Sequence, residues 1–417
     1  MITKALVFLP PCLFAWAANA QQSSDITFIH DGKTVYGTFA VPNGAGKFPV
    51  IIIAPGSGPN DRNGTLILTG ANASCLYPSL LNDTLRPYKE LSDALVDSGY
   101  AVLRYDKLEY TYTTPASLGP ITFHKLWLPV ESAISYVKTR NDVDTTRIIL
   151  IGHSEGSSLI PFIAKNRHDI RALISIAGPR TPLDSLLAEQ IMYIAQTCGG
   201  NVSQAQAQAN QIRSYFNDIR TGNWNVNTPD LFGAPASTWS DYIHAVDSVA
   251  INYNLCSLPT LFIGLELDIN VPLSELTRFE NEITATDDFW NIPGLIHYLT
   301  PDNIPHVSSM LTDTIVYWLR QNILTTLIDS LYPQGGSVSI QPALFDSEFS
   351  ISFDKNDAQQ VCFSVTSITG QEIISHRCHN VSGRLLHRIE MSSFPSGIYL
   401  ANIFFNGQTV IRKIIKR

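Results

Sequence analysis

Several residue patterns are scarce or missing in this 417-residue sequence, and their absence argues against whole classes of function. Charged residues make up only 15% of the chain and the net charge is −8, which argues against nucleic-acid binding and against a basic membrane-binding surface. The histidines are scattered, and neither an H-E-x-x-H sequence nor a paired C-x-x-C occurs, so we expect no metal site and no cofactor. Beyond the N-terminus no apolar run approaches the roughly 18 residues of a transmembrane helix, so none is expected in the mature chain.

The N-terminus has the three parts of a secretory signal peptide. Lys4 supplies a positive charge, residues 5–17 are mostly apolar, and Ala18-Asn19-Ala20 matches a cleavage site. The alternative, a buried N-terminal helix, would carry Pro10-Pro11 in its middle, where proline breaks helices. We therefore predict a signal peptide over residues 1–20 and a secreted chain that begins at Gln21, in a compartment that permits disulfides.

The central feature of the sequence is a short apolar run that ends in Gly152-His153-Ser154-Glu155-Gly156. A helical pattern follows, so the pentapeptide lies between a buried strand and a helix, as in the G-x-S-x-G nucleophile elbow. Ser154 must occupy a strained turn with its Oγ exposed, and the small elbow residues Gly152 and Gly156 make room for that turn. The alternative is a chance glycine–serine turn, which the remaining motifs of the chain disfavour.

Around this elbow, strand-like and helix-like segments alternate at the spacing of right-handed βαβ units. The strand-like runs cover residues 26–30, 34–41, 48–54, 99–106, 147–151, 172–178 and 259–264. Helical patterns cover residues 87–98, about 126–139 and the segment that begins at Leu159. The first two strands are separated by Asp31-Gly32, a strong hairpin signal. The sequence therefore predicts an α/β fold of the α/β-hydrolase type, with a mostly parallel central sheet and flanking helices.

The alternation stops between residues 180 and 257, and an insertion of this length is too long for an ordinary connection. Helical patterns over residues 183–196, 203–219 and 239–251 predict a helical cap over the carboxyl edge of the sheet. Its aromatic residues either line a substrate pocket or pack the cap itself, and the second role is the more common one. They are Tyr193, Trp224, Phe232, Trp239 and Tyr242.

A second change of pattern follows a long helix expected over residues 308–331. Pro333-Gln-Gly-Gly-Ser337 is a linker signal, and short β-runs follow it. We therefore predict a catalytic domain over residues 21–332 and a small antiparallel β-sandwich over residues 337–417.

A nucleophilic serine needs a base, and the base needs an acid to orient it. In α/β-hydrolases the acid follows the serine in sequence and the histidine comes last. Asp268 stands just past the strand over residues 259–264, and only His297 and His306 lie between it and the linker. The expected oxyanion hole consists of the backbone N–H of Glu155 and the backbone N–H of Ser57, in the glycine turn after the strand over residues 48–54.

Of the two histidines, we predict that His297 is the base. His306 follows a proline and is expected in the first turn of a helix, where the helix dipole disfavours the imidazolium that catalysis requires. His297 is expected on a loop past the last strand, where the sheet edge is open to ligand. His306 would then have a structural role or lie at the rim of the pocket.

Four short motifs, taken in order, resemble the secreted α/β-hydrolase esterases that are related to serine aminopeptidases. They are Gly56-Ser-Gly-Pro-Asn-Asp61-Arg62-Asn-Gly64, Ala101-Val-Leu-Arg-Tyr-Asp106-Lys107, Val143-Asp144 with Arg147 and the elbow, and Ile292-Pro-Gly294-Leu-Ile-His297. The chain departs from the family pattern at three places. Pro55 stands where a histidine usually precedes the glycine turn, Leu108-Glu109 replaces Arg-Gly, and Ile296 replaces an asparagine before His297.

The last eighty or so residues resemble a different family, the C-terminal sorting domain of type IX secretion. Phe394-Pro-Ser-Gly397-Ile-Tyr399 and the closing Lys413-Ile-Ile-Lys416-Arg417 carry this resemblance. It implies that the type IX machinery is a partner and that the chain passes through the periplasm of a Gram-negative bacterium to its surface or beyond. A carbohydrate-binding sandwich is the alternative interpretation.

The resemblance and the Ser154, Asp268 and His297 set together predict a secreted serine esterase that acts on small or saccharide-linked acyl esters. Two alternatives remain within the same fold, a serine peptidase and a thioesterase. A catalytically silent surface protein is the alternative from a different class, which the intact set of three residues disfavours.

The five cysteines left after signal cleavage are an odd number, so at least one has no partner within the chain. A hairpin centred on Gly370 would place Cys362 opposite Cys378, at the spacing that a disulfide accepts. A register shifted by one or two residues would instead leave two free thiols. A weaker prediction joins Cys198 to Cys256 across the ends of the cap and leaves Cys75 unpaired.

Overall fold

The structure, a computed structural model, describes residues 22–44, 46–119, 122–283, 287–323, 337–341, 344–345, 347–367, 372–395, 397–405 and 408–416. The predicted signal peptide lies outside the described residues. The chain divides into two compact units, Met1–Ile323 and Leu324–Arg417.

The first unit is built on an 8-stranded sheet with the strand order β1-β2-β6-β3-β7-β8-β9-β10. The pairs β1–β2 and β2–β6 are antiparallel, and every pair from β6 to β10 is parallel. The bounds are Gln22–His30 (β1), Lys33–Val41 (β2), Phe48–Ala54 (β3), Ala101–Tyr105 (β6), Val143–His153 (β7), Ile170–Ile176 (β8), Thr260–Leu265 (β9) and Asp288–Ile292 (β10). A separate small hairpin pairs β4 (Leu66–Ile67) with β5 (Thr84–Leu85). The mostly parallel sheet is the one that the sequence predicts.

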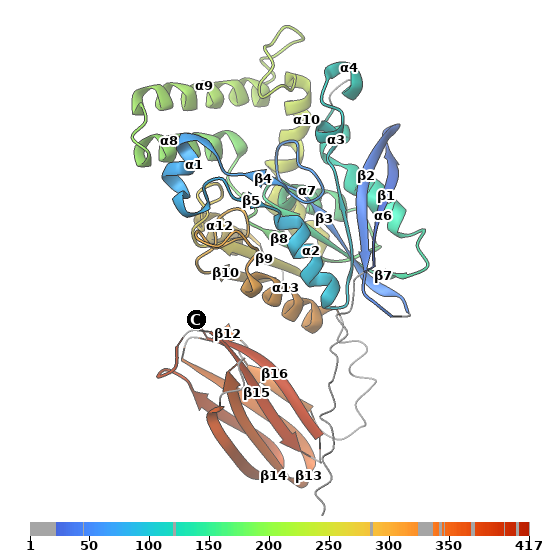
Figure 1. The fold of residues 1–417 in the computed structure, drawn as a ribbon, viewed down its shortest axis with the longest axis vertical. Helices are drawn as coiled ribbons and strands as arrows, with labels where there is room; N and C mark the ends of the chain where they lie inside the picture. Colours follow the sequence, from blue (N-terminus) through green and yellow to red (C-terminus); the bar gives the residue numbers. More distant parts are fainter. Residues whose placement is uncertain are drawn as a thin grey trace, which may run out of the picture. The chain divides into compact units, whose positions relative to one another are not determined.

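The helices of this unit are numbered in chain order and are labelled in Figure 1. They are α1 (Gly70–Leu76), the 3₁₀ helix η1 (Pro78–Leu80), α2 (Pro87–Asp97), α3 (Leu108–Thr111), α4 (Pro115–Leu118), α5 (Phe123–Trp127), α6 (Pro129–Val137), α7 (Glu155–Ala164), α8 (Leu183–Thr197), α9 (Val202–Thr221), α10 (Ala236–Val246), α11 (Val249–Cys256), α12 (Ser274–Glu282) and α13 (Ser309–Asn322).

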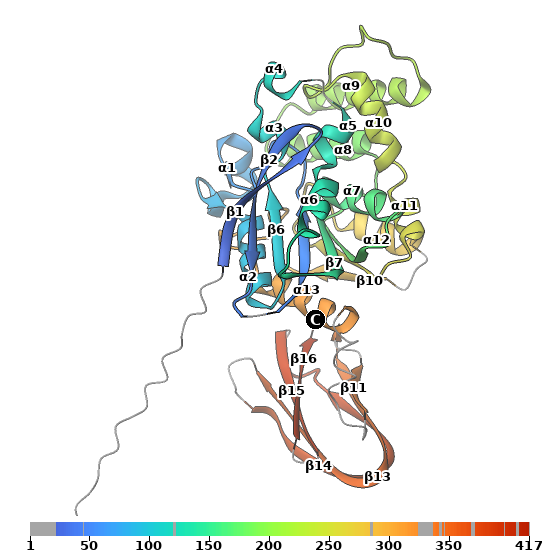
Figure 2. The same cartoon turned by 90° about the vertical axis from the view of Figure 1, so that its right-hand side faces the viewer.

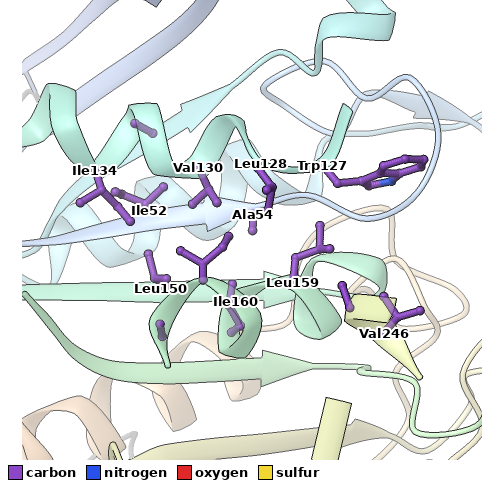
Figure 3. Packing of buried hydrophobic residues seen from close by; sticks show 14 of the residues in the cluster. Ile52, Ala54, Trp127, Leu128, Val130, Ile134, Leu150, Leu159, Ile160 and Val246 are labelled. Atoms are coloured by element: carbon purple, nitrogen blue, oxygen red, sulfur yellow. The ribbon is translucent and has the colours of Figure 1, made fainter. Parts of the chain in front are cut away.

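Alternate residues of the buried strands pack into different layers, because successive side chains of a strand point to opposite faces. Ile52 and Ala54 of β3 belong to the same apolar cluster as residues of α6 and α7. Figure 3 shows them beside Val130 of α6, with Leu159 of α7 nearby. Their neighbour Ile53 is equally buried but lies outside this cluster. The strands are therefore continuous apolar runs, as expected of parallel strands that are covered on both faces.

The insertion expected as a cap forms helices α8, α9, α10 and α11. In both views α8, α9 and α10 lie above the carboxyl ends of the parallel strands (Figures 1 and 2). Helices α8 and α9 pack against each other, and α10 and α11 pack against α7, which begins at the elbow. The cap therefore covers the edge of the sheet at which the predicted site residues lie.

Several helix predictions differ from the structure at their bounds. Helix α7, expected from Leu159, begins at Glu155. The helix expected over residues 126–139 is broken before Pro129, which starts α6, since proline lacks an N–H and suits the first turn. The helix expected over residues 239–251 is divided into α10 and α11, and the side chain of Asn252 donates a hydrogen bond to the carbonyl of Ala245 near the break. The helix expected from residue 308 begins at Ser309 and ends at Asn322, and residues 324–336 lie outside the described residues.

The second unit is a largely antiparallel β-domain, in keeping with the prediction. Its sheet has the strand order β11-β13-β15-β16-β12, with β14 paired to β13. The bounds are Ser337–Gln341 (β11), Leu344–Phe345 (β12), Glu348–Ser367 (β13), Glu372–Glu390 (β14), Gly397–Phe405 (β15) and Gln408–Lys416 (β16). Phe349, Phe363 and Ile403 belong to a small apolar core of its own. The register places Cys362 opposite Cys378, and Cys362 is disulfide-bonded. The side chain of Cys378 lies outside the described residues.

Candidate active site

Ser154 occupies a strained turn at the point where β7 ends and α7 begins. Its backbone angles are φ 53° and ψ −122°, a conformation that L-residues rarely adopt. The Ser154 N–H donates to the carbonyl of Ile176 at the end of β8 over 2.9 Å, which ties the turn to the next strand. A Cβ at Gly152 would collide with the backbone of Gly156, and a Cβ at Gly156 with the backbone of Ala54. The two glycines are therefore required by close approach of the backbone, as the elbow motif predicts.

Asp268 and His297 meet at the same edge of the sheet. Asp268 follows β9 and His297 follows β10, and His297 Nδ1 lies 2.7 Å from Asp268 Oδ2. The other carboxylate oxygen, Oδ1, accepts the backbone N–H groups of Asn270 and Val271, both at 2.8 Å. The Asp268 side chain is completely buried and that of His297 is 9% exposed. Because the carboxylate only accepts hydrogen bonds, Nδ1 must carry the proton, which leaves Nε2 of His297 able to take one.

His306 lies away from this pair. Its side chain is 73% exposed, and its Nδ1 is 3.1 Å from Glu90 Oε1. The other oxygen of Glu90 accepts the N–H of Val307 over 2.7 Å, so these contacts join the loop to α2. The expected position of His306 in a helix is wrong, since α13 begins three residues later with Ser308 as its N-cap.

The glycine turn, Gly56-Ser57-Gly58, lies against Ser154. A Cβ at Gly56 would lie 3.3 Å from the Cβ of Ser154. The Gly56 N–H donates to the hydroxyl of Tyr88 at 2.8 Å, so it is not available to a substrate. The Gly56 carbonyl accepts Nδ2 of Asn60 at 3.0 Å and Nζ of Lys107 at 3.1 Å. The Gly56 carbonyl and the Ser57 N–H belong to one trans peptide group and point in opposite directions, so the Ser57 N–H points away from Asn60 and Lys107.

A buried chain of hydrogen bonds through Tyr88 and His153, here called the relay, connects the glycine turn to His297. Tyr88 Oη lies 2.9 Å from Nδ1 of His153, and Nε2 of His153 lies 2.9 Å from the carbonyl oxygen of His297. A carbonyl only accepts, so Nε2 of His153 donates and its Nδ1 accepts the hydroxyl proton of Tyr88. Burial, followed by the nearby His297, lowers the pKa of His153 to about 3, and burial raises that of Tyr88 to about 12. The relay is therefore neutral at ordinary pH.

Three pockets surround these residues. The central pocket, about 230 Å³, is lined by Ser57, Ser154 and His297 among others. The cap pocket, about 470 Å³, shares Ser57 with it and is also lined by Glu155 and by Trp127, Phe232 and Trp239. The α8 pocket, about 450 Å³, is lined by Glu189, Gln190, Tyr193, Glu266 and Asp268 among others. Lys107, in the cap pocket, is the only cationic side chain that lines any of the three in the described part of the chain.

The cap aromatics divide between the two roles considered for them. Phe232 and Trp239 line the cap pocket and Tyr193 lines the α8 pocket. Tyr242 is buried against Trp127 and Trp239, with ring centroids 4.9 and 5.5 Å away, and Trp224 packs against the same core.

The predicted pairing of Cys198 with Cys256 is wrong. Cys198, which caps the end of α8, is bonded to Cys75 in α1, across 123 residues of sequence. Cys256 is a free thiol whose Sγ contacts the carbonyls of Pro161 and Asn252 at 3.3 and 3.1 Å. Its position against α7 keeps it away from the end of α8. The disulfide therefore joins the cap to the α1 segment of the first unit.

Several residues of the site are not predicted by the sequence. Tyr88 and Asn270 take part only through hydrogen bonds that the fold creates, and their spacing gives no signal. Asn60 belongs to the quoted glycine-turn motif, but its hydrogen bonds to the turn are not predicted. His153 and Lys107 do lie within the quoted motifs, next to strand ends, where a buried polar residue indicates a site. Among the described residues no group of three or more potential ligands could hold a metal ion, and no helix is long and apolar enough to cross a membrane.

Comparison with known proteins gives two family matches in different parts of the chain. Residues 130–230 match the C-terminal domain of the BAAT and acyl-CoA thioester hydrolases. Residues 341–417 match the secretion-system C-terminal sorting domain. The body of the chain has the mostly parallel sheet and flanking helices of the α/β-hydrolase fold. The C-terminal sorting domain indicates that the protein is secreted or displayed at the cell surface. The elbow, residues 152–156, lies inside the residues that match the thioester hydrolase family.

A curated relative of the chain is an esterase. The chain is 26% identical over 300 residues to the esterase EstD of Thermotoga maritima, a match that covers 68% of this chain and 65% of that protein. It therefore spans just under two thirds of the length of that relative. Among solved structures it is similar to Est1E from Butyrivibrio proteoclasticus, with 17% identity, a TM-score of 0.47, and 72% of this chain and 99% of that one covered. It is also similar to the esterase domain of a Rhodothermus marinus protein, with 14% identity, a TM-score of 0.45, and 72% and 98% covered.

Proposed function

We propose that this α/β-hydrolase is a secreted serine esterase with Ser154 as nucleophile, His297 as general base and Asp268 as its orienting acid. The observation that carries the proposal is the strained Ser154 turn in the same pocket as a histidine whose Nδ1 is held by a buried carboxylate. Nε2 of His297 takes the proton of Ser154 as Oγ attacks the ester carbonyl carbon, and it then returns this proton to the leaving alcohol. Water repeats the two steps on the acyl-enzyme and releases the acid.

The oxyanion of each tetrahedral intermediate would be bound by the backbone N–H groups of Ser57 and Glu155. The Ser57 N–H belongs to a peptide whose carbonyl is held on the far side by Lys107 and Asn60. The N–H of Glu155 lies in the first turn of α7, where helix N–H groups have no partner within the helix. Two convergent donors of this kind are usually among the largest contributions to acyl-transfer catalysis.

The pockets favour an uncharged ester over an acyl-CoA thioester. In the part of the chain that the structure describes, Lys107 is the only cation that lines them, and it already contacts Glu109 and Glu155. The pockets would therefore repel the phosphates of coenzyme A, because the one ammonium group that lines them within the described residues is already bound by two carboxylates. The apolar walls of the cap pocket suit an apolar or aromatic acyl group. The carboxylates and the amide of the α8 pocket suit a hydroxyl-rich alcohol such as a sugar.

A substrate panel tests this proposal. The mature protein should hydrolyse p-nitrophenyl esters and an acylated sugar, with kcat/KM at least tenfold higher than for aminoacyl p-nitroanilides or acyl-CoA, and Ser154→Ala should abolish turnover. Faster cleavage of the anilides would indicate a peptidase, and faster cleavage of acyl-CoA a thioesterase. No turnover of any substrate would favour a catalytically silent protein.

We further propose that residues 337–417 direct export by the type IX machinery through the periplasm of a Gram-negative bacterium. The match of residues 341–417 to the sorting-domain family supports this route.

A further inference from the structure

Lys107 is a buried cation at the end of β6, and its surroundings are unusual. Its side chain is only 4% exposed. Its Nζ contacts three oxygens: the carbonyl of Gly56 at 3.1 Å, Oε2 of Glu155 at 3.2 Å and Oε1 of Glu109 at 3.0 Å. An ammonium group has three N–H donors, so these three contacts use all of them.

Two of these three partners belong to the residues that carry the proposed oxyanion donors. The Gly56 carbonyl and the Ser57 N–H are the two ends of one peptide group, so a contact that fixes the carbonyl also fixes the direction of the N–H. Glu155 supplies the second donor from its backbone while its side chain binds the same ammonium. Lys107 is therefore the direct link between the two halves of the hole.

The backbone of Lys107 strengthens this link. Its N–H donates to the carbonyl of Asn60 over 3.0 Å. The side chain of Asn60 in turn donates to the carbonyls of Gly56, Ser57 and Gly58, at 3.0, 2.8 and 3.2 Å. Lys107 and Asn60 thus hold the outer side of the glycine turn, and Tyr88 holds its Gly56 N–H.

The charge state of the cluster argues for an effect through geometry. Burial, the largest influence, would lower the pKa of Lys107, but the carboxylates of Glu109 and Glu155 together raise it above its ordinary value. Lys107 therefore stays a cation. Because two carboxylates face one ammonium, the cluster brings no net positive charge to the oxyanion, so its contribution cannot come from direct charge attraction.

We propose that Lys107 is a positioning residue that sets the geometry of the oxyanion hole by holding the Gly56–Ser57 peptide and Glu155 at a fixed separation. This inference rests on the proposed esterase function. An ion pair that served only the stability of the fold would be a weak stabiliser, because burying charges costs about as much as their attraction returns.

The test compares Lys107→Met with Lys125→Met. Lys125 is a matched control, a buried lysine that contacts Asp31 at 3.6 Å and a backbone carbonyl at 3.3 Å but not the glycine turn. Loss of one oxyanion donor lowers kcat by about 10²–10³-fold in serine hydrolases. Misplacement of a donor should cost less, so Lys107→Met should lower kcat by about 10–100-fold with KM within about threefold of wild type. Lys125→Met should leave both within about threefold of wild type.

A transition-state analogue distinguishes positioning from general damage. A trifluoromethyl ketone forms a tetrahedral adduct with Ser154 whose oxyanion occupies the hole, so its inhibition constant should rise in proportion to the loss of kcat/KM in Lys107→Met. Retention of kcat within threefold would overturn the inference, and so would a loss of kcat without weaker binding of the ketone.

Lys107→Met leaves two buried carboxylates without their cation, so it can fail to fold. In that case the variant Lys107→Met/Glu109→Gln/Glu155→Gln, which removes all three charges, is judged by the same two criteria. Failure of the esterase proposal would appear separately, as a wild-type protein that turns over no ester and does not bind the ketone.

Discussion

Replacing Asp268 by asparagine should remove most of the activity while leaving the fold nearly unchanged. Oδ1 of Asp268 accepts two backbone N–H groups, so the amide oxygen must stay there and the amide nitrogen must take the place of Oδ2. That nitrogen would then face Nδ1 of His297, at present 2.7 Å from Oδ2. Two donors cannot share this contact, so the imidazole proton would move from Nδ1 to Nε2.

A proton on Nε2 blocks the nitrogen that must take the proton of Ser154. The same change of tautomer in a serine protease lowers kcat by about 10⁴-fold, which is about 5 kcal/mol of transition-state stabilisation. We expect a loss of this order in Asp268→Asn with little change in KM, measured with one activated p-nitrophenyl ester. The melting temperature should change by no more than a few degrees, since both backbone hydrogen bonds to Oδ1 remain.

Asp287→Asn is the matched control for this experiment. Asp287 is a partly buried carboxylate at the opposite end of β9, where it accepts the N–H of Thr260 over 3.1 Å. It should retain kcat within about threefold. If Asp268→Asn keeps kcat/KM within tenfold of wild type, the proposed role of Asp268 is wrong.

Three further predictions concern stability and export. Burial raises the pKa of Asp287 from 3.8 to about 6, so its ionisation destabilises the fold increasingly between pH 4 and pH 6. Asp287→Asn should therefore raise the melting temperature at pH 8 but not at pH 4, and an equal gain at both pH values would contradict the pKa shift. The Cys75–Cys198 disulfide spans 123 residues, for which chain entropy predicts about 4–5 kcal/mol, so the double serine variant should melt well below wild type, and an unchanged melting temperature would refute the bond. Truncation after Gln334 should leave a folded, active hydrolase that is not exported, whereas an unfolded product would show that the boundary is wrong.

Much of the fold could be predicted from the sequence because its strands are short apolar runs with clear ends. The carboxyl ends of parallel strands meet at one edge of the sheet. Ser57, Ser154, Asp268 and His297 follow the carboxyl ends of β3, β7, β9 and β10, and so they lie at that edge. The position of each site residue within a few residues of the end of a strand therefore carries most of the prediction.

What the sequence could not predict depends on contacts between distant segments. The partner of Cys198 is in α1, 123 residues earlier, and no local pattern connects them. Tyr88 lies within an ordinary amphipathic helix, and only the fold brings its hydroxyl to Gly56 and His153. The helical pattern over residues 126–139 predicts a continuous helix, whereas in the structure Pro129 starts a new one.

The most direct test of the account is covalent labelling of the nucleophile. A fluorophosphonate should add one equivalent to the mature protein, and peptide mapping should place the adduct on Ser154. His297→Ala should slow this labelling by on the order of 10³-fold or more, while His306→Ala should stay within about tenfold of wild type. Absence of an adduct, an adduct on another residue, or loss of labelling in His306→Ala with retention in His297→Ala would contradict the proposed mechanism.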